Sequence, residues 1–173
     1  LNNLTDFFLE NNQINVLPAS FANLSNLIEL RLNNNKLEIL PESFGQFGEL
    51  IYLYLNHNQL STLPQNFGNM GSLQLLLLNN NQLNTLPASM GNMLSLKELR
   101  LQNNQLVTLP DEIGLLSSLE TLYLQFNSLQ TLPASIGNLG SLNNSLNLDN
   151  NVLYGLPGGI CSIHSELEYF SVN

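Results

Sequence analysis

The sequence predicts an α/β-type solenoid that is mainly β and curved like a horseshoe. One parallel sheet should line its concave face, and short 3₁₀ or irregular segments its convex side. Three observations predict this fold: leucines recur with a period of 23 residues, each copy contains a Leu-Pro pair, and an asparagine holds one fixed position in every copy. One copy is too short to bury its own leucines, so the copies must stack and share a continuous core.

The first part of each copy has the pattern L-x-x-L-x-L and predicts a short β-strand. Apolar residues alternate with period two, so the leucines face inward and the residues between them face outward. Since the chain returns to the same point after each copy, neighbouring strands must run parallel. The first outward column is Asp6, Glu29, Tyr52, Leu75, Glu98, Thr121 and Ser145, and the second is Phe8, Arg31, Tyr54, Leu77, Arg100, Tyr123 and Asn147.

The asparagine that recurs in each copy follows the strand. There the chain turns and leaves backbone groups unpaired in the interior. A side-chain amide offers both a donor and an acceptor. Stacked asparagines can therefore pair these groups, each of which costs about 1–3 kcal/mol when left unsatisfied. We expect a structural asparagine ladder rather than a binding site, with the members Asn12, Asn35, Asn58, Asn81, Asn104, Asn127 and Asn151.

The Leu-Pro pair marks the point where the chain leaves the sheet. Proline lacks the N–H that a central strand needs. The residues left before the next strand are enough only for a short 3₁₀ or irregular segment. A second apolar pair follows each proline, as in Phe67 and Met70, and a glycine follows the first member of that pair in the five copies from Gly45 to Gly137.

These motifs, L-x-x-L-x-L-x-x-N-x-L-x-x-L-P and L-P-x-x-[FIM]-G-x-[LFM], resemble the leucine-rich repeat family. The second motif is similar to the 23-residue type of intracellular Ras-group scaffold proteins. The resemblance covers seven copies and a partial eighth, so we expect residues 1–173 to form a single solenoid domain. Leu1 matches the last core position of a preceding copy, and the eighth copy stops after one strand. We therefore expect part of a longer chain, or a subunit whose ends are covered in a larger complex.

Composition excludes several classes of partner. The formal net charge is −9, with four basic residues and 10% charged residues. Nucleic-acid binding needs clustered Lys and Arg, and an acidic surface repels anionic lipid, so we expect no nucleic-acid partner. No apolar run approaches the roughly 18 residues of a membrane span, so we expect no direct membrane insertion.

The single cysteine, Cys161, excludes an internal disulfide and any zinc site built on cysteines. It favours an intracellular compartment, although an extracellular chain without disulfides would look the same. We expect its small thiol to be partly buried.

The sequence contains no arrangement typical of catalysis or of a bound metal or cofactor. A hydrolytic triad would need a histidine beside a nucleophile and an orienting acid. We interpret His57 as a surface side chain on the turn after its strand. His164 stands near Glu166 and Glu168, but their spacing is generic. We expect a non-enzymatic protein without a cofactor.

The outward columns contain the candidate functional surface. Leu75 and Leu77 should stand exposed beside Tyr52 and Tyr54, and exposed apolar patches mark interaction sites. Tyrosine and arginine are enriched among the residues that dominate binding energy. The predicted concave binding surface consists of Phe8, Arg31, Tyr52, Tyr54, Leu75, Leu77, Arg100, Tyr123 and Phe126, and His57 lies on the same rim as Phe126.

Three functions fit this surface. The leading hypothesis is a protein–protein interaction module that binds a protein partner, of unknown identity, through the concave face. The alternatives are a structural subunit of a larger assembly and recognition of a small ligand or glycan by polar residues such as Asn33, Asn56 or Gln102. A purely stabilising role also fits part of the face, because Glu29 can neutralise Arg31 and an arginine can rest on an aromatic ring.

Overall fold

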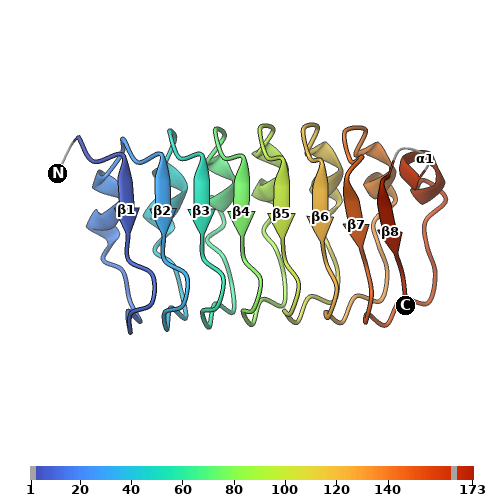
Figure 1. Ribbon diagram of the computed structural model, residues 1–173, viewed down its shortest axis with the longest axis horizontal. Coiled ribbons are helices and arrows are strands. Elements are labelled where there is room, and N and C mark those ends of the chain that lie inside the picture. Colours follow the sequence, from blue (N-terminus) through green and yellow to red (C-terminus); the bar gives the residue numbers. More distant parts are fainter. Residues whose placement is uncertain (1–2, 165–166) are drawn as a thin grey trace.

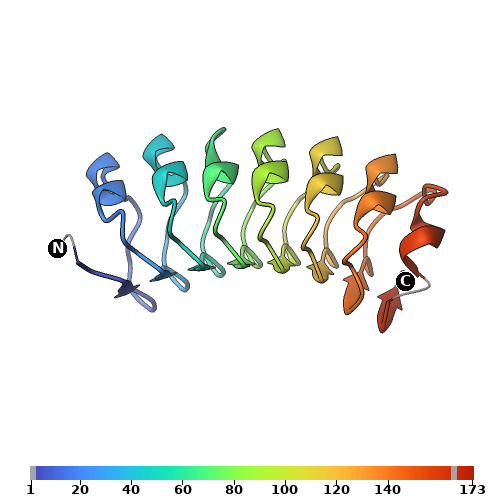
Figure 2. The same cartoon turned by 90° about the horizontal axis from the view of Figure 1, so that it is seen from above.

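The computed structural model describes residues 3–164 and 167–173, which form a solenoid of stacked copies (Figure 1). Its strands form one sheet in chain order, each parallel to the next. Seen from above, the strands line the inner side of the arch and the short helices its outer side (Figure 2). The predicted fold class is confirmed.

The strands are β1 (Asp6–Phe8), β2 (Glu29–Arg31), β3 (Tyr52–Tyr54), β4 (Leu75–Leu77), β5 (Glu98–Arg100), β6 (Thr121–Tyr123), β7 (Ser145–Asn147) and β8 (Tyr169–Ser171). The 3₁₀ helices are η1 (Ala19–Asn23), η2 (Glu42–Gln46), η3 (Phe67–Asn69), η4 (Ala88–Asn92), η5 (Asp111–Leu115) and η6 (Ala134–Asn138), and the α-helix is α1 (Ile160–His164). Both outward columns predicted from the sequence occupy the first and last residues of β1 to β7.

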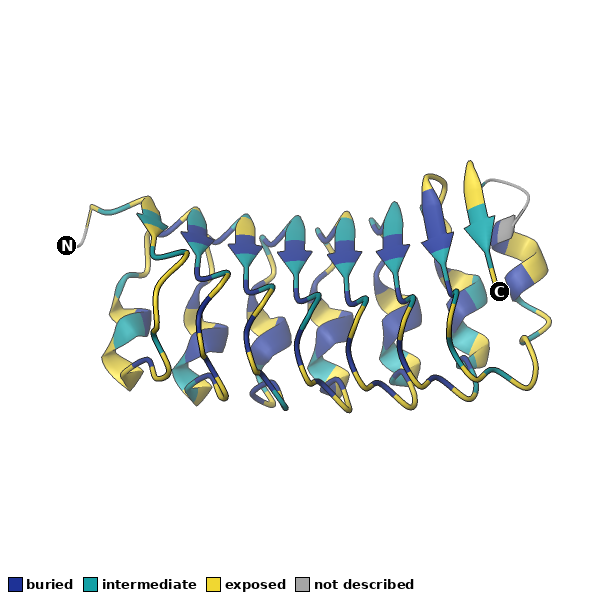
Figure 3. Ribbon diagram, turned by 60° about the horizontal axis from the view of Figure 1, so that its bottom comes forward, coloured by how far each residue is buried: buried dark blue, intermediate teal, exposed yellow. Residues whose placement is uncertain are grey.

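Equivalent residues of neighbouring copies stand opposite each other in the sheet. Leu53 of β3 pairs with Leu76 of β4, and both side chains are fully buried. Figure 3 shows the same arrangement along the sheet, with a buried residue in the middle of each strand from β2 to β6 and more exposed residues on either side. The predicted alternation of inward and outward residues is confirmed.

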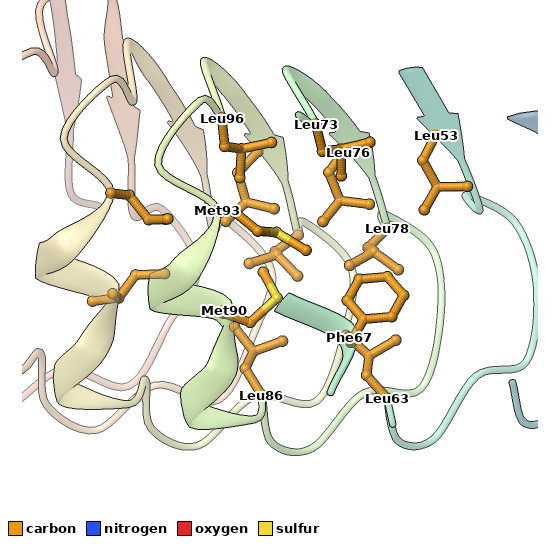
Figure 4. Packing of buried hydrophobic residues seen from close by; sticks show 14 of the residues in the cluster. Leu53, Leu63, Phe67, Leu73, Leu76, Leu78, Leu86, Met90, Met93 and Leu96 are labelled. Carbon is orange, nitrogen blue, oxygen red and sulfur yellow. The ribbon is translucent and has the colours of Figure 1, made fainter. Parts of the chain in front are cut away.

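The core lies between the sheet and the 3₁₀ helices. Leu76 and Leu78 enter it from β4 and the residue after it, and Phe67, Met90 and Met93 enter it from the helical side (Figure 4). All five side chains have no solvent exposure. Each copy therefore contributes to a core that it shares with its neighbours, as the shortness of one copy requires.

Asparagine side chains close the turn that follows each strand. The Oδ1 of Asn81 accepts a hydrogen bond from the N–H of Leu60 at 3.0 Å. Its Nδ2 donates to the carbonyl oxygens of Leu55 and Leu78, both at 3.0 Å. One side chain thus links its own copy to the preceding one. The same three hydrogen bonds recur at Asn35, Asn58, Asn104, Asn127 and Asn151.

Asn12, the first predicted member of the ladder, differs from the other six. It is exposed, and its Nδ2 donates only within its own copy, to the carbonyl oxygens of Leu9 and Glu10 at 3.1 Å. In the described chain no strand precedes β1, so no backbone N–H from an earlier copy reaches its Oδ1. The ladder that we expected is confirmed from Asn35 onward, and Asn12 makes none of the links between copies.

Proline and glycine shape the outer side of the solenoid. Pro87 precedes η4 with φ −70°, and its carbonyl oxygen accepts a hydrogen bond from the N–H of Met90 at 3.0 Å. The glycine that recurs in the five copies from Gly45 to Gly137 lies where successive 3₁₀ turns contact each other. A Cβ on Gly68 would lie 1.7 Å from the carbonyl oxygen of Ser89 in the next copy, so only glycine permits this approach.

The last copy departs from the pattern, because α1 stands where the other copies have a 3₁₀ helix. Ile160 and Ile163 of α1 are buried, whereas Cys161 is exposed. The expectation of a partly buried thiol is wrong, because the face of α1 that carries both isoleucines packs on the core and Cys161 points away from it. Across the described residues, the structure contains no helix with the length and apolarity that crossing a membrane requires.

Replacing Asn81 with alanine tests the ladder. The variant leaves the N–H of Leu60 and the carbonyl oxygens of Leu55 and Leu78 without their amide partner in the interior. We expect the free energy of unfolding to fall by at least about 2 kcal/mol, since each unsatisfied buried group costs about 1–3 kcal/mol. Urea denaturation followed by circular dichroism measures the change.

Asn12→Ala is the matched control. Because Asn12 is exposed and bonds only within its own copy, its loss should cost at most about 1 kcal/mol. Equal losses in the two variants would contradict the assignment of the links between copies to the ladder.

Candidate binding surface on the concave face

The sheet brings nearly all of the predicted surface residues together on its inner face. Phe126 alone lies outside the strands, three residues after β6. The others occupy outward positions of consecutive strands: Phe8 in β1, Arg31 in β2, Tyr52 and Tyr54 in β3, Leu75 and Leu77 in β4, Arg100 in β5 and Tyr123 in β6.

Tyr52, Tyr54, Leu75 and Leu77 form the concave block at the centre of this face. Tyr52 stands opposite Leu75, and Tyr54 opposite Leu77. Tyr52 is 39% exposed, and the other three are half-buried. The two leucines are therefore less exposed than expected, because side chains on strands only about 4.8 Å away cover their flanks.

Arg31 lies between two aromatic rings. Its guanidinium carbon is 4.6 Å from the ring centroid of Phe8 and 5.2 Å from that of Tyr54. Its Nε donates to Oε1 of Glu29 at 2.6 Å. This hydrogen bond is the main cause that raises the pKa of Arg31, and the charge of Glu29 adds to it. The charge of Arg31 is therefore balanced by that of Glu29, and its planar guanidinium continues the surface formed by the two rings.

Strand β5 repeats this arrangement with the same Glu-Leu-Arg sequence. The Nε of Arg100 donates to Oε1 of Glu98 at 2.5 Å, and its guanidinium carbon is 5.4 Å from the ring centroid of Tyr123. The neutralisation of each arginine by a glutamate, which the stabilising interpretation requires, is present. That interpretation leaves the concave block between the two arginines without an explanation.

Tyr54 keeps its hydroxyl proton at neutral pH. Its pKa is raised mainly because burial disfavours the phenolate, and the charge of Glu29 raises it further while that of Arg31 lowers it. A protonated tyrosine in the concave block can donate a hydrogen bond to a bound chain.

His57 and Phe126 mark one rim of the face in an unusual backbone conformation. Their φ angles are 55° and 58°, in the left-handed region. Asparagines hold the equivalent positions of the other copies, at Asn11, Asn34, Asn80, Asn103 and Asn150. Asparagine adopts this conformation readily, whereas phenylalanine does so at a cost. Phe126 is also 53% exposed, and strain at an exposed aromatic side chain favours a functional role for it.

The sequence analysis named Asn33, Asn56 and Gln102 only as polar candidates and missed that they belong to a third outward column, which lies two residues after the second. It consists of Glu10, Asn33, Asn56, Asn79, Gln102, Gln125 and Asp149. Backbone pairing between copies continues past the strands, since the N–H of Leu78 donates to the carbonyl oxygen of Arg100 at 2.9 Å and that of Asn80 to the carbonyl oxygen of Gln102 at 3.0 Å, and the alternation of side chains continues with it up to the third column. The sequence did contain one signal for this column: all seven side chains carry an acceptor oxygen, at a position that the repeat motif leaves unspecified.

Four side-chain oxygens of this third column are shielded from solvent and have no hydrogen-bond partner within the described chain. They are Glu10 Oε2, Asn56 Oδ1, Gln102 Oε1 and Gln125 Oε1. Shielded acceptors without a donor are uncommon in folded proteins. All four belong to one column along this edge of the face.

Two shallow hollows open on the same face. One, of about 290 Å³, lies between Tyr52, Leu75 and the side chains before β5 and β6. The other, of about 570 Å³, lies along β6 to β8, with Tyr123, Glu168 and Tyr169 among its walls.

Groups that could hold a metal ion are absent from the part of the chain that the structure describes. The side chains of His164 and Glu166, which the sequence places near Glu168, lie outside the described residues. The described face thus consists of apolar side chains, paired charges and polar amides.

Comparison with known proteins identifies the family. One leucine-rich repeat family model matches residues 38–83, and a second matches residues 26–47, 95–116 and 118–139. These matches span more than half of the chain, and the chain belongs to the leucine-rich repeat family. No curated protein sequence matches it significantly.

Solved structures share the fold over almost the whole chain. A leucine-rich repeat protein of Leptospira interrogans has 39% identity and a TM-score of 0.92, covering 98% of this chain and 43% of that one. The plant peptide hormone receptor RGFR1 in complex with RGF2 has 28% identity and a TM-score of 0.89, covering 99% of this chain and 28% of that one. An internalin of Listeria monocytogenes, at 23% identity and a TM-score of 0.82, shares the fold, covering 98% of this chain and 48% of that one. The chain spans less than half the length of each.

Replacing Phe126 with asparagine tests the strain at the rim. Because asparagine tolerates positive φ, we expect Phe126→Asn to raise the free energy of unfolding by about 1 kcal/mol. Asn103→Phe, at the equivalent position of the preceding copy, should lower it by a similar amount. Urea midpoints of both variants measure the effect, and a loss of stability in Phe126→Asn would show that packing of the ring outweighs the strain.

Proposed function

We propose that this chain is a non-enzymatic protein-interaction module and that its concave face binds the partner. The concave block carries the proposal. Equivalent outward positions in other copies hold Glu29, Glu98 and Thr121, so the fold accepts polar residues there. The solenoid itself therefore does not require four large apolar side chains at the centre of the sheet, and binding is the function that explains them.

The similar plant receptor supports a polypeptide partner. It is a peptide hormone receptor, and its structure was solved in complex with RGF2. The extended, regularly spaced columns of this chain suit a ligand that runs across several copies, because each copy adds one row of outward side chains about 4.8 Å from the last.

The size of the concave block limits how tightly it can bind alone. Burying a large apolar side chain contributes about 1.5–3 kcal/mol, and less here because three of the four are already half-buried. Association costs about 4–15 kcal/mol. The partner must therefore also contact neighbouring residues such as Arg31, Arg100 and Tyr123, and its footprint spans several copies.

Photo-crosslinking tests which face binds. A benzophenone side chain placed at Tyr54 or Leu77 should capture the same partner protein in an extract of the source cells. The same group at Leu94 or Leu115, each 55% exposed in or beside the 3₁₀ helices, should not capture it. Capture only from the helical positions would overturn the assignment to the concave face.

A paired substitution measures the contribution of the concave block. Tyr54→Ser with Leu77→Ser should reduce capture of that partner at least about tenfold, because both apolar contacts at the centre are lost. Leu94→Ser with Leu115→Ser is the matched control and should leave capture unchanged. Circular dichroism of both double variants verifies that the fold survives.

A further inference from the structure

The cations on the concave face are all paired with acids of the same face. Arg31 pairs with Glu29 at 2.6 Å and Arg100 with Glu98 at 2.5 Å. Lys97, at the edge of one hollow, pairs with Glu120 at 3.9 Å. These pairs leave no basic side chain on this part of the described chain to attract an anionic partner.

The charges that remain on the face are acidic and lie towards its two ends. Asp6 and Glu10 lie at the β1 end, and Asp149 and Glu168 lie at the end formed by β7 and β8. No ion pair involves these four carboxylates within the described residues. Glu10 lies two residues after β1, in the third outward column.

The hollow along β6 to β8 suits a cationic side chain. Tyrosine rings at Tyr123 and Tyr169 and the carboxylate of Glu168 are among its walls, and the remaining residues are small and polar. A lysine or arginine held near tyrosine rings and a carboxylate gains from the ring quadrupoles and from the opposite charge.

The third column carries uncharged amide side chains between the two acidic ends. Asn56 Oδ1, Gln102 Oε1 and Gln125 Oε1 are shielded and unpaired in the described chain. Because these three oxygens are shielded in the structure, the amide side chains must turn outward to accept from the backbone N–H groups of an extended polypeptide that lies across the strands.

From these observations, and resting on the proposed function, we propose that the partner presents an extended basic segment with an apolar centre. Its apolar residues lie on the concave block, and its basic residues reach Asp6 and Glu10 at one end and the hollow beside Glu168 at the other. The distance from β1 to β7 is roughly 29 Å at 4.8 Å per strand, which an extended chain of about nine residues spans.

Synthetic peptides test this proposal directly. The probe is a fluorescent peptide of about 13 residues with two lysines at each end and an apolar centre of leucine and tyrosine. Its two comparison peptides carry glutamate in place of lysine, or serine in place of the apolar centre. Fluorescence anisotropy with the whole chain should show the probe binding at least about tenfold more tightly than either comparison peptide, and more weakly as NaCl rises from about 50 to 300 mM.

Charge-matched variants separate local recognition from the general attraction of an acidic protein. The triple variant Asp6→Asn, Glu10→Gln, Glu168→Gln should weaken binding of the probe at least about fivefold. The control Glu42→Gln, Glu49→Gln, Asp111→Asn removes the same charge in or beside the helices η2 and η5 and should leave binding nearly unchanged. Equal weakening by both variants, or equal binding of the glutamate peptide, would overturn the proposal.

Failure of the basic-segment proposal can be distinguished from failure of the proposed function. If the probe does not bind but photo-crosslinkers at Tyr54 and Leu77 still capture a protein, then the basic segment is wrong and the concave site stands. If capture occurs only from Leu94 or Leu115, then both proposals fail.

Discussion

Hydrogen bonding by the buried asparagines is the constraint on which the rest of the structure depends. After each of the strands β1 to β7 the chain turns through one left-handed residue, and the turn leaves carbonyl and N–H groups facing the interior. The amide of Asn81, like its equivalents, satisfies groups of its own copy and of the preceding copy at once. The ladder therefore closes each turn and holds successive copies in one register, and that register decides which outward side chains become neighbours.

A fixed interior leaves the outward positions open to variation. Leu53 and Leu76 are buried in equivalent places, while the residues flanking them range from tyrosine to leucine and, in β2 and β5, to glutamate and arginine. Since the parallel sheet brings equivalent positions side by side, a sequence difference between two copies becomes a local feature of the surface. The concave block and the two Glu-Leu-Arg strands beside it arise in this way, without any change in the backbone.

The features that follow from burial could be predicted from the sequence, and those that depend on neighbours could not. The period and the inward leucines repeat, so the strands, the 3₁₀ helices and both outward columns were predictable. The half-buried state of Leu75 and Leu77, the exposure of Asn12 and the exposure of Cys161 depend on what lies beside each residue. The left-handed turn and the third column were visible only as runs of asparagine and glutamine, whose polarity alone does not distinguish a turn from a surface.

The pairing of charges on the concave face bears on how such a surface selects a partner. An arginine that is hydrogen-bonded to a glutamate and lies against aromatic rings offers a flat contact surface but little net charge. Long-range attraction is then left to the carboxylates at the two ends, and short-range contact to the apolar centre. Charges at the periphery of an interface act mainly on the rate of association, whereas a packed apolar centre acts on the rate of dissociation. On the proposed function, the concave face would divide the two tasks between different copies of one repeat, and each task could change by substitution at outward positions while the ladder beneath stays the same.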